Sequence, residues 1–357
     1  MIVRGQGAKL FDERGRELID LCAGYGSIWL GHNHPAVNRA LAAQLETYAA
    51  PGYLPVEAHE AARRAFAPFL PAGYFLGGIY STGMEAIETA LRAAWAHTGR
   101  TAVAGVAGST HGRSFLTSAI GAGEPDPLRP FVHSLPNFEL LPPVAARLDL
   151  AAIVVEPVQM TGGGHELSRE TCAALFEVAH ERGSLVVFDE TLTGLYRCGA
   201  RYYADLMGVT PDILVLGKGL ANGFPASAVL LREGIAWDRE RVRPGSTYWN
   251  HPLACAATAA TLAELAASGV EPKVRRIERV IRSELGSLEL RGRGAMWCLG
   301  SPRADRQHAF AQAILEKGVV VSYYERYLRL LPPLGIEPAE LTRACKAIAA
   351  AHADTFG

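Results

Sequence analysis

The segment SLVVFDETLTGLYRCGARYYADLMGVTPDILVLGK, residues 184–218, decides the fold because two of its apolar runs each end on a charged side chain. The first run ends at Asp189, and the second ends at Lys218. Their separation is close to the spacing of about 30 residues that a strand, a crossover helix and the next parallel strand require. Ligands of open α/β sheets bind at the carboxyl ends of the strands, so the acid and the lysine are predicted to share a site.

The same alternation of strands and helices extends on both sides of this segment. The runs AVAGVAG, AAIVVEP and ASAVLL read as strands, and residues 168–182 read as a helix. Glu156 ends the AAIVVE run at a similar distance before Asp189, so three functional side chains are expected at one sheet edge. We predict an α/β fold with a mostly parallel sheet in a large domain over residues 48–252. A smaller α+β domain is expected over 253–357, with the N-terminal segment 1–47 packing against it.

Composition limits the class of ligand and the compartment. The 357 residues include 35 basic and 36 acidic side chains, which leave a net charge of −1 and no basic run. Nucleic acid and anionic membrane are therefore not expected as partners, and the predicted ligand is a small molecule. Six cysteines without a C-x-x-C pair indicate unlinked thiols in a reducing compartment. With no signal peptide or membrane-spanning run near the start, a cytoplasmic location is expected.

A helix start supplies a candidate phosphate site. In STGMEAIETALRAAW, residues 81–95, Thr82 and Glu85 stand in capping-box register, and Gly83 leaves the first turn open to a ligand. The free amides of such a turn bind phosphate. Taken singly, this pattern also fits an ordinary capped helix, Asp189 fits a helix cap, and Lys218 fits a solvated lysine. Their combination favours an aromatic nitrogen cofactor that carries a phosphate.

His32 and His34 do not indicate a metal site. They lie in the loop GHNHP with no third ligand nearby. Since protein zinc sites use at least three side chains, we expect no bound metal and interpret both histidines as hydrogen-bonding loop residues.

Nine motifs in a fixed order carry a family resemblance that covers nearly the whole chain. They are LFDERGRELIDLCAGYGSIWLGHNHPAV, STGMEAIETALRAA, GSTHGRS, IVVEPVQ, LVVFDE, PDILVLGKGLANGFP, GSTYWNHPLACAA, RGRGAMW and LRLLPPL. In this order they resemble the class III aminotransferases. The resemblance implies fold type I and dependence on pyridoxal 5′-phosphate.

The resemblance also implies roles for individual residues around the cofactor. Lys218 matches the lysine that forms the Schiff base and moves the substrate proton, and Asp189 matches the partner of the pyridine nitrogen. A carboxylate there keeps the nitrogen protonated, so the ring can accept an electron pair. The other implied cofactor contacts are the phosphate-binding amides of Gly83 and Met84, the neighbours Thr110 and His111, and Thr247. Because the family's equivalent of Thr247 comes from the neighbouring subunit, a homodimer is implied.

The substrate residues follow from the same resemblance. Arg113 and Arg329 match arginines that bind substrate carboxylates, and Glu156 matches a glutamate that covers the second arginine when no α-carboxylate is present. Together they imply glutamate and 2-oxoglutarate as one exchange pair. Arg113 as a surface residue and Glu156 with Arg329 as a structural ion pair remain alternatives. Further implied pocket residues are Tyr25, Trp29 and Tyr53.

Three positions depart from the family pattern. Thr110 stands where a stacking Phe or Tyr is usual, Leu192 replaces a Gln that bonds the phenolic oxygen of the ring, and Thr191 replaces Val. The chain is also short between residues 121 and 150, which suggests an open site and leaves carrier-bound acceptors among the alternatives. The predicted function is ping-pong transfer of an amino group from glutamate to a carbonyl acceptor. The alternatives are an aminomutase of the glutamate-1-semialdehyde type, which needs no separate donor, and a non-catalytic binding protein.

Overall fold

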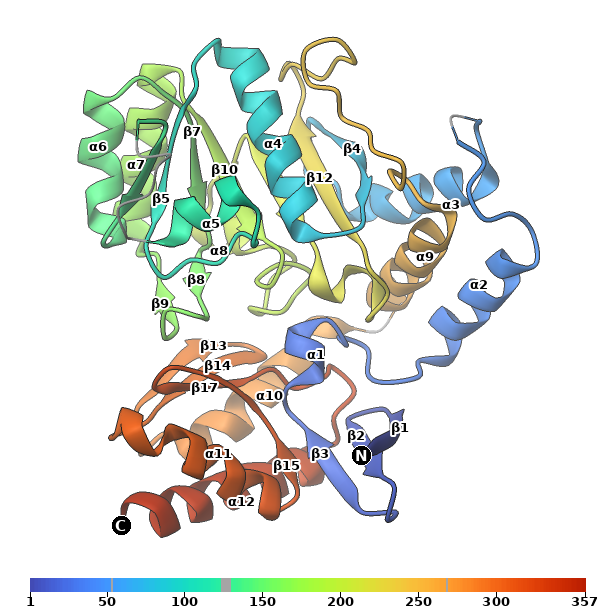
Figure 1. Cartoon of the computed structure of the whole chain (residues 1–357), viewed down its shortest axis with the longest axis vertical. Helices are drawn as coiled ribbons and strands as arrows, with labels where there is room; N and C mark the ends of the chain where they lie inside the picture. The colour runs from blue at the N-terminus through green and yellow to red at the C-terminus, as the bar shows by residue number, and fades with distance from the viewer. Residues whose placement is uncertain (53, 123–129, 268) are drawn as a thin grey trace.

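The computed structural model describes residues 1–52, 54–122, 130–267 and 269–357. Figure 1 shows a larger body built around a long twisted sheet and, below it, a smaller body that contains both ends of the chain. The fold is that of an α/β protein with a large, mostly parallel sheet.

The large sheet contains seven strands within the described ranges. In spatial order they are β4 (Tyr74–Tyr80), β12 (Ser227–Arg232), β11 (Ile213–Leu216), β10 (Leu185–Glu190), β7 (Leu150–Val155), β5 (Ala102–Val106) and β6 (Val132–Leu135). Of these strands β12 alone runs in the opposite direction to the others. Strands β7, β10 and β11 are buried at every position, as expected for a sheet covered on both faces.

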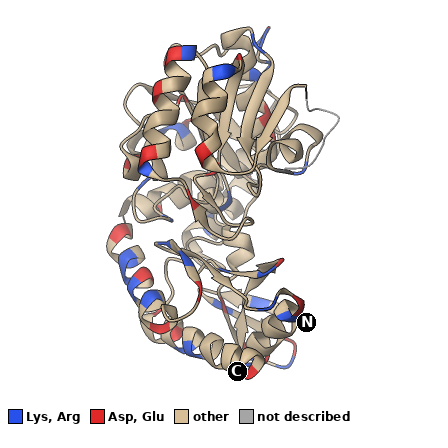
Figure 2. Ribbon diagram, turned by 90° about the vertical axis from the view of Figure 1, so that its left-hand side faces the viewer, with Lys and Arg blue, Asp and Glu red and all other residues tan. Residues whose placement is uncertain are grey.

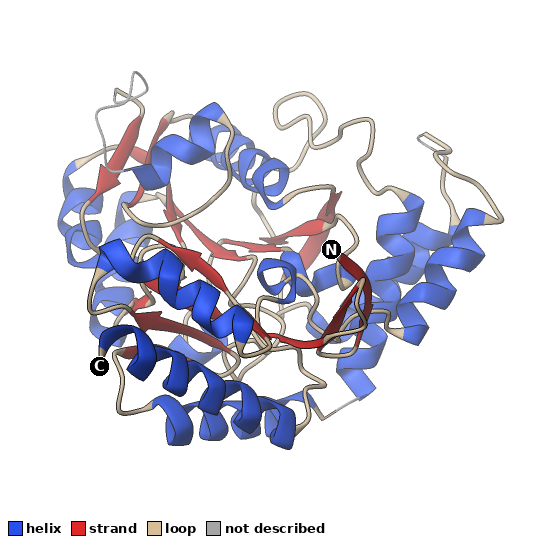
Figure 3. Cartoon of the chain, turned by 60° about the horizontal axis from the view of Figure 1, so that its bottom comes forward, coloured by secondary structure: helices blue, strands red, loops and turns tan. Residues whose placement is uncertain are grey.

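Helices cover both faces of this sheet, as Figure 3 shows in a view from below. Helix α4 (Gly83–Thr98) begins after Thr82, whose hydroxyl accepts a hydrogen bond from the Glu85 amide, and it ends at Gly99 in a left-handed conformation. Helix α7 (Arg169–Arg182) begins after Ser168 in the same way. The other helices of this body include α5 (Phe115–Ala122), α6 (Leu141–Arg147) and α8 (Tyr203–Met207).

The smaller body is an antiparallel sheet with helices on one side. Its strands, in spatial order, are β13 (Leu290–Arg293), β14 (Met296–Gly300), β17 (Tyr327–Leu330) and β16 (Ser322–Tyr324). Helix α10 (Val270–Leu285) buries an apolar side chain every three or four residues, which is the pattern of an amphipathic helix against a core. The other helices after residue 251 are α9 (Pro252–Ala267), α11 (Gln307–Glu316) and α12 (Pro338–Phe356) within the described ranges.

The N-terminal segment contacts both bodies. Strands β1 (Ile2–Gln6), β2 (Lys9–Asp12) and β3 (Glu17–Asp20) form a sheet with β15 (Val319–Val320), in which β3 and β15 are parallel. After the short α1 (Ala23–Gly26), helix α2 (Pro35–Leu45) packs against α9, and α3 (Glu57–Phe66) packs beside it. His32 bonds Asp20 at 2.8 Å, so this histidine orders the loop between β3 and α2.

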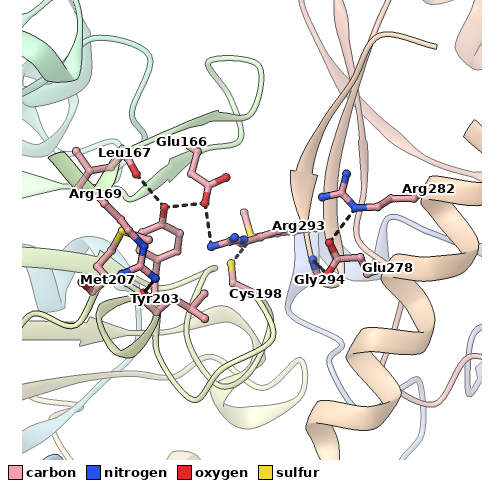
Figure 4. Close-up of polar contacts among 12 residues, drawn as sticks. Glu166, Leu167, Arg169, Cys198, Tyr203, Met207, Glu278, Arg282, Arg293 and Gly294 are labelled. Atoms are coloured by element: carbon pink, nitrogen blue, oxygen red, sulfur yellow. Dashed lines mark hydrogen bonds and ion pairs between the residues drawn. The ribbon is translucent and has the colours of Figure 1, made fainter. Parts of the chain in front are cut away.

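A polar contact joins the two bodies (Figure 4). Arg293 of β13 forms a 3.0 Å ion pair with Glu166 of the short strand β9 (His165–Glu166), which pairs with β8 (Val158–Gln159). Glu166 also accepts a hydrogen bond from the Tyr203 hydroxyl at 2.9 Å. Beside this pair, the Cys198 thiol lies 3.3 Å from the Met296 sulfur. Side chains of the large body therefore contact both strands of the β13–β14 hairpin.

Acidic and basic residues are interspersed along the chain, as the red and blue ribbon segments of Figure 2 show, for example in α10. All six cysteines are free thiols. In the described part of the chain no single helix is long and apolar enough to span a membrane, although α9 and α10 reach that composition jointly across an 80° bend.

Candidate active site

Three neighbouring parallel strands end at the same edge of the large sheet, and a predicted site residue lies at or just beyond the end of each. Asp189 pairs in register with Val215 of β11, and Lys218 follows that strand by two residues. Glu156 comes directly after β7, which is the other neighbour of β10. The topology therefore brings Glu156, Asp189 and Lys218 together, as their spacing in the sequence predicts.

Asp189 is a buried carboxylate with a donor on each oxygen. Its Oδ2 lies 2.8 Å from His111 Nδ1, and its Oδ1 accepts the Thr191 amide at 3.1 Å. Burial alone would raise the pKa of Asp189, but the His111 hydrogen bond and the charges of His111 and Lys218 outweigh it and lower the pKa. The side chain is 2% exposed and holds a negative charge that faces the end of the sheet.

Lys218 is half-buried and bonds Thr191. Its Nζ donates to the Thr191 hydroxyl at 3.1 Å. The residue has a φ of 43°, in the left-handed region that L side chains rarely adopt. Such backbone strain is found at functional sites, where the surrounding structure enforces it.

The start of α4 lies beside this pair. A Cβ added at Gly83 would lie 3.3 Å from Thr191 Cγ2, and one at Gly217 would lie 3.2 Å from the same atom. The Thr191 γ-methyl group therefore packs closely against both glycines, where a Cβ would be crowded. The amides of Gly83 and Met84 belong to the first turn of a helix, where backbone donors have no intrahelical acceptor. An anion such as a phosphate fits this turn.

Glu156 bonds the backbone beside it rather than an arginine. Its Oε2 accepts the Thr110 amide at 2.8 Å, and burial raises the pKa of Glu156 to about 7, an effect that the nearby Lys218 charge reduces and the Asp189 charge increases. Within the described ranges no ion pair joins Glu156 to Arg329. The structure therefore differs from the state that the resemblance implies without an α-carboxylate, in which Glu156 covers this arginine. The exposed Thr110 bonds Thr161 through their hydroxyl groups.

Two arginines are available for an anionic ligand. The Arg329 guanidinium lies 5.5 Å from the centre of the Tyr25 ring, and its Nε is buried without a partner. Arg113 is exposed and, among the residues that the structure describes, makes no hydrogen bond or ion pair. Thr247 is also exposed, and its neighbour Ser246 bonds Glu85 of α4 at 2.5 Å. This bond places the Thr247 loop next to the phosphate turn of its own chain.

Trp29 lies in the core and not on an open pocket. It is 1% exposed, its indole N–H donates to the Leu195 carbonyl at 2.9 Å, and the Arg197 guanidinium stacks 3.8 Å above its ring. The expectation that Trp29 contacts substrate does not match this placement, because the indole has no surface left for a ligand. Tyr53, the other predicted aromatic contact besides Tyr25, lies outside the described residues.

Two further residues were not singled out as site residues by the sequence. Arg197 is buried, with no carboxylate partner among the residues that the structure describes. It bonds the carbonyls of Gly26 and Pro332 at 2.7 and 3.0 Å, and burial lowers its pKa to about 9. Thr191 contacts both Asp189 and Lys218. The sequence marked Thr191 only as a departure from the family pattern, and its distance of two residues from Asp189 was the available signal.

These residues fit pyridoxal 5′-phosphate, the cofactor that the resemblance implies. The site offers a glycine-lined helix start for the phosphate, a buried carboxylate for the pyridine nitrogen and a lysine amine for the carbonyl carbon. His111 Nε2 is buried and without a partner, a polar atom that a ligand can satisfy. Within the described ranges no group of three or more His, Cys, Asp and Glu side chains could hold a metal ion.

Comparison with known proteins gives one consistent result. A family model described as aminotransferase class-III matches residues 1–352. A LysW-aminoadipate semialdehyde/glutamate semialdehyde transaminase of Aeropyrum pernix is 34% identical, over 95% of this chain and 92% of that protein. An acetylornithine aminotransferase of Aquifex aeolicus is 31% identical, over 96% and 94%. The solved structure of the ornithine aminotransferase from Toxoplasma gondii, with partial occupancy of pyridoxal phosphate at its active site, superposes with a TM-score of 0.89. It is 28% identical and covers 99% of this chain and 90% of that one.

Proposed function

This chain belongs to the class III aminotransferases, enzymes that use pyridoxal 5′-phosphate, and on that premise we propose that it moves the amino group of glutamate to an aldehyde acceptor. The observation that carries the proposal is the placement of Asp189 and Lys218 at adjacent strand ends, beside the start of α4. The two half-reactions share one site, so the kinetics are expected to be ping-pong.

Each residue of the site has a defined task in this proposal. The bound cofactor supplies an electron sink for the pair left behind when the substrate Cα proton departs. Lys218 Nζ would hold the cofactor covalently, and the free amine would carry the proton from the substrate Cα. Asp189, ionised and fixed by His111, keeps the pyridine nitrogen protonated. The first turn of α4 orients the cofactor through its phosphate.

The two arginines support glutamate as the donor. Guanidinium groups bind carboxylates in bidentate fashion, and glutamate carries two of them. Arg329, uncovered by Glu156 and with an unsatisfied Nε, is suited to the α-carboxylate. Arg113, exposed and without a described partner, is suited to the side-chain carboxylate. A monocarboxylate donor would use only one of these groups.

The names of the relatives support a semialdehyde acceptor. The Aeropyrum pernix protein is named for semialdehydes, and the Aquifex aeolicus protein for acetylornithine, whose side-chain amine is the transamination product of a semialdehyde. In this chain Thr110, which bonds Thr161, stands in place of a bulky stacking ring and leaves space for a long or substituted acceptor. An aldehyde at the end of an acylated chain is therefore the acceptor class we propose.

A homodimer in the cytoplasm completes the proposal. Thr247 is exposed and makes no bond within the described chain, which is consistent with a threonine that serves the phosphate of a second subunit. Six free thiols suit a reducing compartment.

The test adds donors to the cofactor-loaded protein one at a time, without acceptor, and follows the visible absorbance. Glutamate is expected to convert one equivalent of cofactor to its amino form, and a semialdehyde added afterwards is expected to restore the original spectrum. Turnover of an amino aldehyde with no donor would instead establish the aminomutase alternative. No spectral response to any donor would overturn the proposal.

A further inference from the structure

Thr191 contacts Asp189, Lys218 and the glycine at the start of α4. Its amide donates to Asp189 Oδ1 at 3.1 Å, and its hydroxyl accepts from Lys218 Nζ at the same distance. Its Cγ2 fills the space beside Gly83 and Gly217. One face of the residue thus packs against the phosphate turn, and the hydroxyl is left for the lysine.

Three carboxylate oxygens near the lysine already accept hydrogen bonds. The two oxygens of Asp189 take the His111 ring and the Thr191 amide, and the Oε2 of Glu156 takes the Thr110 amide. Leu192, the next residue, has no polar atom in its side chain and packs against Gly26. Among the described residues, the Thr191 hydroxyl is the acceptor to which Lys218 Nζ donates.

We propose that Thr191 is a positioning residue, whose hydroxyl holds the Lys218 amine in place whenever that amine is not bonded to the cofactor. This state occurs in the cofactor-free protein and, if the proposed function holds, again after the donor has displaced the lysine. A hydroxyl can accept from an ammonium and can also donate to a neutral amine, so it retains the lysine in both protonation states. The valine that is usual at this position offers no such contact.

The role can be measured without any transfer reaction. Cofactor-free protein is labelled with trace acetic anhydride near neutral pH, and mass spectrometry gives the labelling rate of Lys218 relative to the exposed Lys346. Thr191→Val removes the hydroxyl at nearly constant volume. It is expected to raise the relative rate about five-fold, the factor that corresponds to a hydrogen bond of about 1 kcal/mol. Thr191→Ser keeps the hydroxyl and is expected to label within about two-fold of the native protein.

A second readout is the rate of covalent capture of added pyridoxal 5′-phosphate, followed by absorbance. Capture is expected to slow in Thr191→Val and to be restored in Thr191→Ser. Thermal unfolding verifies that each variant is folded, and Thr191→Ala replaces the valine variant if that one fails to fold.

Two results would overturn the proposal. One is a Thr191→Val variant in which the labelling rate of Lys218 and the capture rate of pyridoxal 5′-phosphate both equal those of the native protein. The other is an equal change in Thr191→Val and Thr191→Ser, which would assign the effect to the packing of the γ-methyl group. Because neither readout involves a donor or an acceptor, failure here is distinct from failure of the proposed aminotransferase activity.

Discussion

Glu156→Gln should change how the stability of the protein depends on pH. Burial raises the pKa of Glu156 from 4.5 to about 7, so the folded protein keeps this proton at pH values where the unfolded chain has lost it. The free energy of unfolding therefore falls as the pH rises from 4.5 to about 7. The full shift corresponds to about 3 kcal/mol, since each pKa unit is about 1.4 kcal/mol. Glutamine is neutral throughout, and its oxygen can still accept the Thr110 amide.

Urea unfolding of the cofactor-free protein at several values between pH 5 and pH 8 measures this effect. Across this range the free energy of unfolding of the variant is expected to rise by about 2–3 kcal/mol relative to that of the native protein, because part of the loss already occurs below pH 5. Glu190, whose pKa is also raised to about 7 by burial, is present in both proteins and cancels in the difference. Glu139→Gln, at an exposed position, is the matched control and should leave the pH dependence unchanged. If Glu156→Gln leaves it unchanged too, Glu156 is already ionised in the folded protein at pH 5, and the charge of Lys218 outweighs burial.

Three further predictions concern the roles of single side chains. Asp189→Ala should slow the half-reaction with glutamate by a factor of about 10² to 10⁴, the usual range for loss of acid–base assistance, and a native rate in stopped-flow absorbance would contradict its role. Arg113→Ala should raise the KM for glutamate at least about ten-fold, because a hydrogen bond to a charged group contributes about 1.5–3 kcal/mol, and should leave the KM for alanine nearly unchanged. An equal rise for both donors would place Arg113 outside the carboxylate site. Trp29→Phe should lower the free energy of unfolding by about 1–2 kcal/mol through loss of the indole hydrogen bond and a weaker Arg197 stack, with no change in KM. If KM changes and the free energy of unfolding does not, Trp29 belongs to the substrate pocket and not to the core.

Much of the fold was predictable because it is encoded in local spacing. The strands that end near Asp189 and Lys218 are apolar runs separated by one crossover helix, and a parallel sheet brings such ends to one edge whatever the loops do. The start of α4 followed from a capping pair three residues apart. Both predictions need only periodicity and the chemistry of neighbouring residues.

The contacts that the sequence did not reveal depend on residues far apart in the chain. Trp29 is a core residue because its indole N–H donates to a carbonyl 166 positions away. No pattern within GYGSIWLG predicts that partner. The Thr191 hydroxyl faces Lys218 because β10 and β11 are adjacent in a specific register. Whether Glu156 meets an arginine or a backbone amide depends on side-chain rotation, which residue spacing does not determine.

Because β3 pairs with β15, which comes late in the chain, the N-terminal sheet can be completed only late in biosynthesis. Ile19 lies opposite Val319, so most of the chain must be made before the third strand of the protein finds its neighbour. At about 5–20 residues per second, synthesis of the roughly 300 residues between them lasts about 15–60 s. During this time one edge of β3 on the nascent chain has no partner strand. Lys9 and Glu17, charged residues of the same sheet, help to keep this exposed edge soluble. Ribosomal pausing at any point between the two strands would prolong this exposure.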